Sequence, residues 1–253
     1  MTSKIIAEIG VNWSSDISIA KDMIIKSKRA GADFVKFQMF NNEVIKDSKY
    51  KDELSSMILD DELVAELYLC AKLNRIKFGV STMYEEAFNT LNEADIVPDF
   101  IKIRHADRNN HEIAQRAVDY CLINDTKLIV SVEDFFMGSK LRYDTSIIYE
   151  RYEFTNYMYC IPKYPSELSQ IYKEYINSKY FSGYSNHYPS KYLPMIAITG
   201  NLKFVEVHVR RPLKGSNMLY NPGLQIDENI SIDFDDLEDV CKFRDTLSKL
   251  RTR

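Results

Sequence analysis

The feature that most constrains the fold of this chain is a regular alternation between two hydrophobic patterns. Short runs rich in Val, Ile, Phe and Tyr are followed by longer stretches with helical periodicity, and this unit recurs about every 25–30 residues, the length of a βα repeat. The pattern predicts eight strands, at residues 5–9, 33–39, 76–82, 100–105, 127–132, 154–160, 181–187 and 204–209. Strands that alternate with helices form parallel sheets, and eight such units close most economically into a single (β/α)8 TIM barrel.

The stretches between the strands predict most of the connecting helices. The first begins at about Ile17, with Asp16 as its N-cap. The others are expected at residues 60–73, 85–94, 111–123, 165–176 and 190–199, and a last one at about 233–250. Residues 41–60 are expected to form a βα loop over the site, and residues 135–149 have only weak helical character.

A doubly wound open sheet is the main alternative fold. No GxGxxG motif follows the first strand, no Walker loop is present, and the chain has only 8 glycines with which to build a dinucleotide loop. The length of 253 residues matches a barrel of about 250 residues. We therefore expect one barrel domain over residues 1–253, with no second domain and no linker.

Net charge, apolar runs and cysteine spacing limit the kinds of partner and the cell compartment that we expect. The formal net charge is −4, so the chain lacks the basic footprint of a nucleic-acid-binding protein. No apolar run approaches the roughly 20 residues of a membrane span, and no signal peptide is visible. The four cysteines are widely spaced without a CxxC pair, as in a protein of a reducing compartment. We expect a cytoplasmic protein that acts on small molecules.

Three of the four histidines fall at the ends of predicted strands: His105, His187 and His208. The carboxyl ends of the strands are where an α/β barrel keeps its chemistry, and imidazole is a common metal ligand. His187 and His208 end adjacent strands, which predicts a divalent metal with open positions for substrate or water. For each histidine alone, a structural role at a strand end is the alternative.

Every predicted strand ends in polar groups. In chain order they include Glu8 and Asn12, Lys36 and Gln38, Ser81 and Thr82, Lys102 with Arg104 and Asp107, Ser131 and Glu133, Lys163 and Tyr164, Ser185, and Glu206. Two lysines and an arginine at one mouth indicate an anionic ligand, a phosphate or a carboxylate, and Glu8 is a candidate for proton transfer. The residues alone predict metal-assisted chemistry on a phosphorylated or carboxylated small molecule.

Several of these motifs resemble those of the sialic acid synthase family. The opening of the family is similar to Ile-Ala-Glu-Ile-Gly-Val-Asn at residues 6–12 and to Ala-Gly-Ala-Asp-Phe-Val-Lys-Phe-Gln at residues 30–38. The match continues in order through Ser81-Thr82, Ile101-Lys102-Ile103, Tyr164-Pro165, residues 183–187 and residues 205–208. The resemblance covers essentially the whole chain. It implies a (β/α)8 enzyme that condenses phosphoenolpyruvate with an N-acetyl amino sugar or similar aldose to a 3-deoxy-ulosonic acid, with release of phosphate.

The resemblance also implies roles for individual residues. His187 and His208 would hold a divalent metal, commonly Mn²⁺ with Mg²⁺ or Co²⁺ as alternatives, that polarises the sugar aldehyde. Glu8 and Tyr164 would be catalytic, Glu8 by proton transfer and Tyr164 on the sugar side. The other expected substrate-binding residues are Lys36, Thr82, Lys102, Ser131 and Ser185 for phosphoenolpyruvate, Gln38 and Asp107 for the sugar, and Asn12, His105 and Asp227.

The chain departs from the family pattern at several strand ends. Trp13 stands where the family has His, and His105 stands where it has a serine on the phosphate side. Glu133 replaces a glycine, and Pro162 replaces an asparagine that contacts phosphate. The family's C-terminal antifreeze-like domain, which supplies an arginine across a dimer, is not evident. Side chains that would compensate are Arg104, His105, Lys163 and Arg210.

Three hypotheses about function follow. The first is a phosphoenolpyruvate-dependent synthase with an altered acceptor. The second is a related metal-dependent barrel aldolase, lyase or isomerase that acts on a sugar acid. The third is a non-catalytic, synthase-like sugar-binding protein. A homodimer through the outer helices is also expected, whereas the sequence does not identify the sugar. Because His105 matches no family ligand, it is the residue most indicative of a different substrate.

Overall fold

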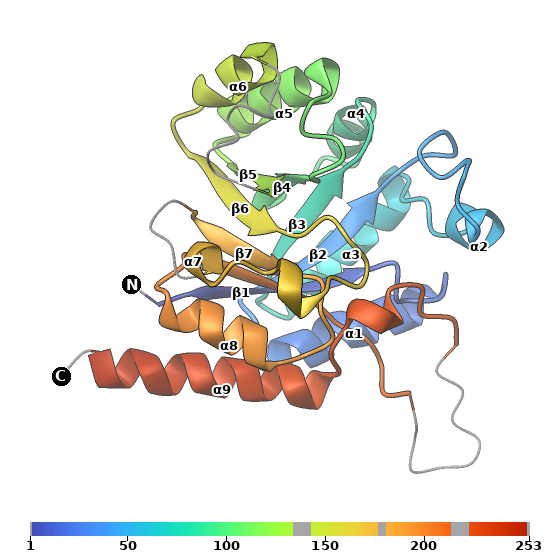
Figure 1. Ribbon diagram of the computed structural model, residues 1–253. Coiled ribbons are helices and arrows are strands. Elements are labelled where there is room, and N and C mark those ends of the chain that lie inside the picture. Colours follow the sequence, from blue (N-terminus) through green and yellow to red (C-terminus); the bar gives the residue numbers. More distant parts are fainter. Residues whose placement is uncertain (1, 134–142, 177–180, 214–222, 252–253) are drawn as a thin grey trace.

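The eight strands close into a barrel in sequence order in a computed structural model of the chain (Figure 1). The structure describes residues 2–133, 143–176, 181–213 and 223–251. Each strand is parallel to the next, and β8 pairs with β1 to complete the barrel. The predicted (β/α)8 architecture is confirmed. The strands are β1 (Lys4–Gly10), β2 (Phe34–Met39), β3 (Lys77–Thr82), β4 (Phe100–Ile103), β5 (Lys127–Val132), β6 (Thr155–Cys160), β7 (Gly183–Asn186) and β8 (Phe204–His208).

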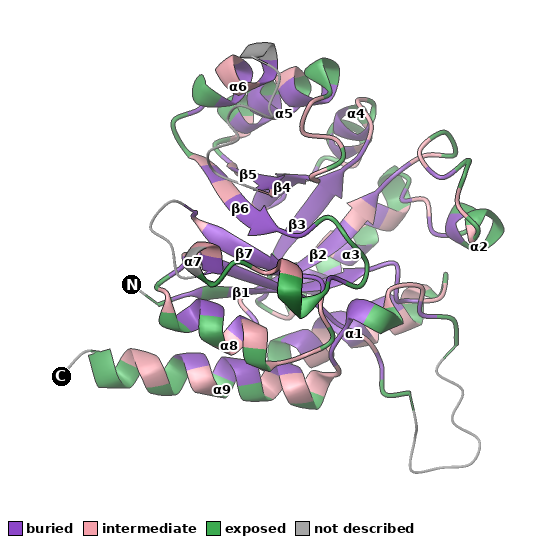
Figure 2. Ribbon diagram, viewed as in Figure 1, coloured by how far each residue is buried: buried purple, intermediate pink, exposed green. Residues whose placement is uncertain are grey.

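Helices surround the barrel, and their buried faces turn toward the strands (Figure 2). They are α1 (Ile17–Arg29), α2 (Lys51–Ser55), α3 (Asp61–Leu73), α4 (Ala87–Glu93), α5 (His111–Asn124), α6 (Tyr143–Glu150), α7 (Lys173–Ile176), α8 (Tyr192–Thr199) and α9 (Phe234–Arg251). The side chain of Asp16 accepts a hydrogen bond from the N–H of Ser18, so the predicted N-cap of α1 is confirmed. No described helix is long and apolar enough to cross a membrane.

The helix predicted over residues 165–176 is wrong. This segment holds a 3-10 turn, Leu168–Gln170, followed by the short helix α7. Glu167 and Ile171 flank the turn with extended backbone, at ψ 142° and 112°, and these angles interrupt a helical path. Hydrophobic spacing alone did not reveal the interruption.

Three other boundaries also differ from the prediction. The loop expected at residues 41–60 contains the helix α2. Strand β4 ends at Ile103, so Arg104 and His105 lie in the turn that follows it. The weak helix expected at residues 135–149 is present in part as α6, and residues 134–142 lie outside the described residues.

The interior of the barrel is built in layers. An apolar floor consists of Ile6, Phe34, Phe100, Ile129, Met158 and Phe204. Gly79 leaves room for the Phe100 ring, because a Cβ at this position would lie 2.1 Å from Phe100 Cε1. Side chains alternate along a strand, so residues two positions further on form the next interior layer. That layer consists of Glu8, Lys36, Ser81, Lys102, Ser131, Cys160, Ser185 and Glu206, all of them buried.

Candidate active site

Four charged side chains occupy the centre of the second layer and are almost inaccessible to solvent. Lys36 Nζ lies 3.1 Å from Glu8 Oε2 and 3.3 Å from Glu206 Oε2. Lys102 Nζ lies 2.5 Å from Glu206 Oε1. The exposed fractions of these residues are 0% for both glutamates, 3% for Lys36 and 4% for Lys102. We call this group, Glu8, Lys36, Lys102 and Glu206, the ionic layer.

Two serines complete the hydrogen bonding of the lysines. Lys36 Nζ donates to Ser81 Oγ over 2.7 Å, and Lys102 Nζ donates to Ser185 Oγ over 3.3 Å. Ser185 Oγ in turn donates to Glu206 Oε1 over 2.8 Å. Each ammonium group is therefore held by carboxylate and hydroxyl oxygens together, as a buried charge requires.

The two lysines differ in how well their charge is compensated. Burial opposes the charge of Lys36, but Glu206 and Glu8 outweigh it and raise the pKa of Lys36. Burial lowers the pKa of Lys102, and the one adjacent carboxylate, Glu206, does not fully offset it. Burial would raise the pKa of Glu206, yet Lys102 and Lys36 hold that pKa well below its ordinary value. Glu206 is thus the anion on which both lysines depend.

Glu8 is oriented by a neighbouring amide. Gln38 Nε2 donates to Glu8 Oε1 over 2.8 Å. Gly10 lies at the bend that ends β1, with φ +54°, and a Cβ there would come within 3.0 Å of Gln38 Nε2 and 3.1 Å of Glu8 Oε1. A side chain at residue 10 would therefore press on this pair, and glycine leaves both the conformation and the space open.

His187 and His208 lie side by side above the ionic layer. Their ring centroids are 5.4 Å apart, and their planes are inclined by 71°. His187 Nδ1 lies 2.7 Å from the carbonyl oxygen of Ile161, so Nδ1 carries the proton and Nε2 keeps its lone pair. Burial, and then the neighbouring His208, lower the pKa of His187 to about 3, so the ring is neutral near pH 7.

This pair fits a divalent metal in its donor chemistry. Neutral imidazoles are favourable ligands, and two ligands from adjacent strands leave several coordination positions for water or substrate. Within the described ranges, no group of three or more His, Cys, Asp or Glu residues is arranged to hold a metal. Among the described residues, the two histidines thus leave the remaining coordination positions of such a metal to water or substrate.

Tyr164 lies over the two histidines. Its ring stacks on His187 with centroids 4.3 Å apart, and it meets His208 edge-on at 6.3 Å. The residue is 58% exposed, so its other face is open to solvent. Tyr164 therefore forms part of the wall of the barrel mouth.

On the β8 side, Asp227 and Asn12 approach His208. Asp227 Oδ2 lies 3.3 Å from His208 Nδ1. The N–H of Asp227 donates to Asn12 Oδ1 over 2.9 Å. Asp227, one of the predicted substrate-binding residues, thus lies next to His208.

On the opposite side of the mouth, charged groups pair among themselves. Arg104 makes two contacts to Asp107, from Nε at 2.5 Å and from Nη2 at 3.0 Å. His105 Nε2 lies 3.6 Å from Glu133 Oε2, and Arg108 contacts both Nδ1 and the carbonyl of His105. This side therefore presents paired charges at the rim.

The structure brings most of the predicted residues together. The cavity at the mouth is lined by Glu8, Lys36, Gln38, Ser81, Lys102, Arg104, His105, Ser131, Cys160, Tyr164, His187, Glu206 and His208. Five predicted residues are not in this lining: Asn12, Thr82, Asp107, Ser185 and Asp227. Asp107, Ser185 and Asp227 contact residues that line the cavity, and Asn12 contacts Asp227. The hydroxyl of Thr82 is buried without a hydrogen-bond partner in the described part of the chain.

Sequence reasoning did not assign roles to Ser81, Cys160 and Glu206. Period-two alternation from the apolar floor would have selected all three, since they lie two residues after Gly79, Met158 and Phe204. Burial raises the pKa of the Cys160 thiol to about 12, so it is not a thiolate at neutral pH.

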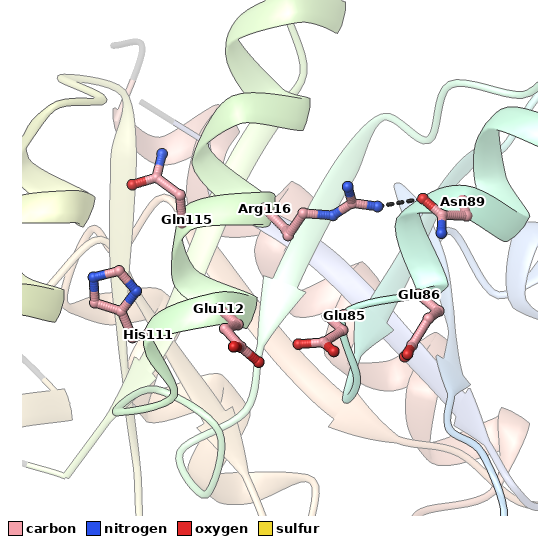
Figure 3. Close-up of a pocket in the computed structure, with 7 residues that line it drawn as sticks. All are labelled: Glu85, Glu86, Asn89, His111, Glu112, Gln115 and Arg116. Carbon is pink, nitrogen blue, oxygen red and sulfur yellow. Dashed lines mark hydrogen bonds between the residues drawn. The ribbon is translucent and has the colours of Figure 1, made fainter.

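A larger cavity lies elsewhere, in a groove of about 470 Å³ between α4 and α5 (Figure 3). In this view the carboxylates of Glu85 and Glu112 face one another, while Arg116 bonds to Asn89 across the groove. Most of its lining residues are exposed. The enclosed space at the mouth is only about 30 Å³, yet it is there that the buried, coupled ionisable groups lie.

Comparisons with known proteins agree with this geometry. The model of the NeuB family matches residues 23–250. N-acetylneuraminate-9-phosphate synthase of Drosophila melanogaster is 26% identical over 237 residues, which are 84% of this chain and 62% of the relative. N,N'-diacetyllegionaminic acid synthase of Legionella pneumophila is 47% identical over 45 residues, 18% of this chain and 13% of the relative. The matches thus span less than two thirds of the length of these curated relatives.

Among solved structures, N-acetylneuraminic acid synthetase from Leptospira borgpetersenii shares the fold. It superposes with a TM-score of 0.81 at 20% identity and covers 100% of this chain and 86% of that one. At this identity the superposition establishes the barrel architecture, and residue roles need separate support.

Proposed function

This chain belongs to the NeuB family, and we propose that it condenses phosphoenolpyruvate with an aldose to form a sialic-acid-like 3-deoxy-ulosonic acid with release of phosphate. The acceptor would be an N-acetyl amino sugar or a close relative. The observation that carries the proposal is the position of the ionic layer directly below the two imidazoles of His187 and His208 at one barrel mouth.

Phosphoenolpyruvate carries a phosphate and a carboxylate, and Lys36 and Lys102 would bind these anions. Lys36 is paired with Glu8 and Glu206, Lys102 is paired with Glu206, and the cavity at the mouth that they line has a volume of only about 30 Å³. Binding would exchange part of these ion pairs for contacts to the ligand. The serines on neighbouring strands, among them Ser131 and Ser185, would supply hydroxyl donors to the same oxygens.

Glu8 would transfer the proton that the reaction moves. The enol carbon attacks the aldehyde carbon, water adds to the former enol, and the phosphate leaves, so a base and acid are needed beside the reacting carbons. Glu8 is among the residues that line the mouth cavity, and Lys36 and Gln38 hold it and fix its orientation. Tyr164 would pack against the sugar with its exposed ring face.

His187 and His208 would hold a divalent metal, Mn²⁺ with Mg²⁺ or Co²⁺ as alternatives. A metal bound there would supply Lewis-acid stabilisation of the negative charge that develops on the aldehyde oxygen. The residues support this role because both rings lie at the mouth and His187 keeps the lone pair of Nε2.

We also propose that His105 and Glu133 alter the choice of acceptor. They replace a serine and a glycine of the family motif, and the contact between them, 3.6 Å, places an imidazole and a carboxylate at the rim. The predicted homodimer and cytoplasmic location stay predictions.

A coupled assay tests the proposal. Phosphate released from phosphoenolpyruvate is measured with a panel of aldoses and Mn²⁺, for the wild type and for Lys36→Met. We expect release that depends on one class of aldose and that is lost in the variant. A matched control is Lys46→Met, at an exposed lysine that pairs with Glu43 and does not line the mouth cavity.

The outcomes separate the alternatives. Pyruvate released from a ulosonic acid without phosphoenolpyruvate would indicate a lyase. Absence of turnover together with absence of Mn²⁺ binding by calorimetry would indicate a non-catalytic relative.

A further inference from the structure

We propose that Asn12 and Asp227 act as positioning residues for His208, rather than as groups that contact substrate. Together they fix the tautomer of His208 that leaves its Nε2 lone pair directed to the site. The inference rests on the proposed function in one respect, that His208 is a metal ligand.

The first observation is the environment of His208 Nδ1. This nitrogen is buried, and in the described part of the chain it makes no hydrogen bond, while Asp227 Oδ2 lies 3.3 Å away. A carboxylate is an acceptor only, so a contact with it favours the tautomer that carries its proton on Nδ1. At this separation, a rotation that aligns the N–H with the carboxylate oxygen would complete the hydrogen bond.

The second observation is the way in which Asp227 is held. Asn12 is fully buried at the end of β1, and its Oδ1 accepts from the N–H of Asp227 over 2.9 Å. Its Nδ2 donates to the carbonyl of Val209 over 2.9 Å and to Ser231 Oγ over 3.0 Å. Ser231 Oγ donates to the carbonyl of Asp227 over 2.6 Å. The polar atoms of Asn12 are thus engaged in holding the segment around Asp227 against the end of β8.

The third observation is the parallel with His187. Its Nδ1 lies 2.7 Å from the carbonyl oxygen of Ile161, a fixed acceptor from the end of β6. Both rings therefore have an acceptor at Nδ1, one from the backbone and one from a side chain. In two rings held in this way, the same kind of atom, Nε2, keeps its lone pair.

An acceptor that contacts the imidazole nitrogen not used for metal binding affects the nitrogen that is used. An acceptor at one ring nitrogen fixes the tautomer and orientation of the imidazole and raises the basicity of the other nitrogen. Without Asp227, the tautomer with its proton on Nε2 would become accessible to His208, and that tautomer cannot bind a metal through Nε2. The loss would act on metal affinity before any substrate binds.

Two measurements on the full-length protein test the proposal. The first is ¹⁵N NMR of the histidine rings without metal, at a pH well above the ordinary histidine pKa of about 6.5. We expect the Nδ1–H tautomer for His208 in the wild type and a mixed or inverted population in Asp227→Ala. The second is titration with Mn²⁺ alone, in which Asp227→Ala should weaken binding by about 10–100-fold.

Variants at and near Asp227 provide the controls. Asp227→Asn keeps the shape and an acceptor oxygen, so its tautomer population and Mn²⁺ affinity should lie between those of the wild type and Asp227→Ala. Glu228→Gln makes the same carboxylate-to-amide change one residue away, on an exposed side chain, and should change neither measurement. Asn12→Ser should shift the tautomer in the same direction as Asp227→Ala.

The outcomes distinguish this inference from the proposed function. If Asp227→Ala keeps the wild-type tautomer and Mn²⁺ affinity while KM for the aldose rises, Asp227 contacts substrate and the inference is overturned. If the wild type binds no Mn²⁺, the metal role in the proposed function fails. The tautomer measurement, which needs no metal, still decides whether Asp227 positions His208.

Discussion

The ionic layer and the groove between α4 and α5 are both rich in charge, but they differ in burial. Glu8 and Glu206 are 0% exposed, and every charge of the layer contacts an opposite one. In the groove, Glu112 and Arg116 are exposed. The carboxylates of Glu85 and Glu112 face one another and repel each other, and Glu112 raises the pKa of Glu85 (Figure 3). The groove has the larger volume, whereas the ionic layer costs more free energy because its charges are buried.

That cost is informative about function. Exposed ion pairs contribute about 0–1 kcal/mol, so charges in a groove need no special explanation. Buried ion pairs often contribute less to stability than apolar side chains of the same volume would. The barrel already has an apolar floor directly below, so a second apolar layer was a feasible alternative. Two buried lysines and two buried glutamates in its place indicate selection for chemistry rather than for stability.

The largest expected effect comes from the anion that both lysines share. Glu206→Gln leaves Lys102 without its carboxylate partner and Lys36 with one of two, so we expect a loss of about 3–5 kcal/mol in the free energy of unfolding. Urea denaturation at neutral pH measures it. The double variant Lys102→Met with Glu206→Gln should recover part of the loss, because it removes the uncompensated charge. A loss below about 1 kcal/mol in the single variant would show that the layer is well hydrated and would remove the contrast with the groove.

The same residue predicts a pH dependence. The folded pKa of Glu206 is held below its ordinary value, so its contribution to stability is fully present above about pH 4.3 and is lost as pH falls through the folded pKa. Unfolding midpoints followed from neutral to acidic pH should decrease less steeply in Glu206→Gln than in the wild type. Equal slopes would assign the acid sensitivity to other carboxylates.

The barrel could be predicted from the sequence because each unit carries its own signal. Eight strand runs recur, stretches with helical spacing follow most of them, and the strands pair in sequence order. The segment at residues 165–176 could not be predicted in the same way. Its apolar spacing is helical, but its backbone angles depend on packing between the barrel mouth and the outer layer, which a single sequence does not display.

The candidate site, like the fold, could be predicted from the sequence only in part. Strand ends and motif resemblance selected Lys36, Lys102, His187 and His208, because these residues lie on the strands or directly after them. Which of two adjacent hydroxyls faces inward depends on register, and here Ser81 faces Lys36 whereas Thr82 does not line the cavity. Contacts between distant segments, such as Asn12 with Asp227, were not accessible to pattern reasoning at all.

The neighbouring residues Ser81 and Thr82 supply a test of the ionic layer in which the expected effect is intermediate in size. Ser81→Ala removes the 2.7 Å hydrogen bond from Lys36, so we expect a loss of about 0.5–1.5 kcal/mol in unfolding free energy and a higher KM for phosphoenolpyruvate. Thr82→Val is the matched control, since it removes a buried hydroxyl that has no hydrogen-bond partner in the described residues. It should leave stability unchanged or higher. A KM effect in Thr82→Val alone would instead support the role that the family resemblance gives to Thr82.

The smallest expected effect lies in the groove. Glu112 raises the pKa of Glu85, so the repulsion costs stability that increases as pH rises through the ordinary and the raised pKa values. Glu85→Gln should therefore slightly raise the unfolding midpoint at neutral pH and have no such effect in acid, where both carboxyls are protonated. In the background of Glu112→Gln the same substitution should add nothing, and this double-mutant cycle isolates the pair. A gain as large as the loss in Glu206→Gln would mean that the groove is as strongly coupled as the ionic layer, and burial would no longer distinguish the two regions.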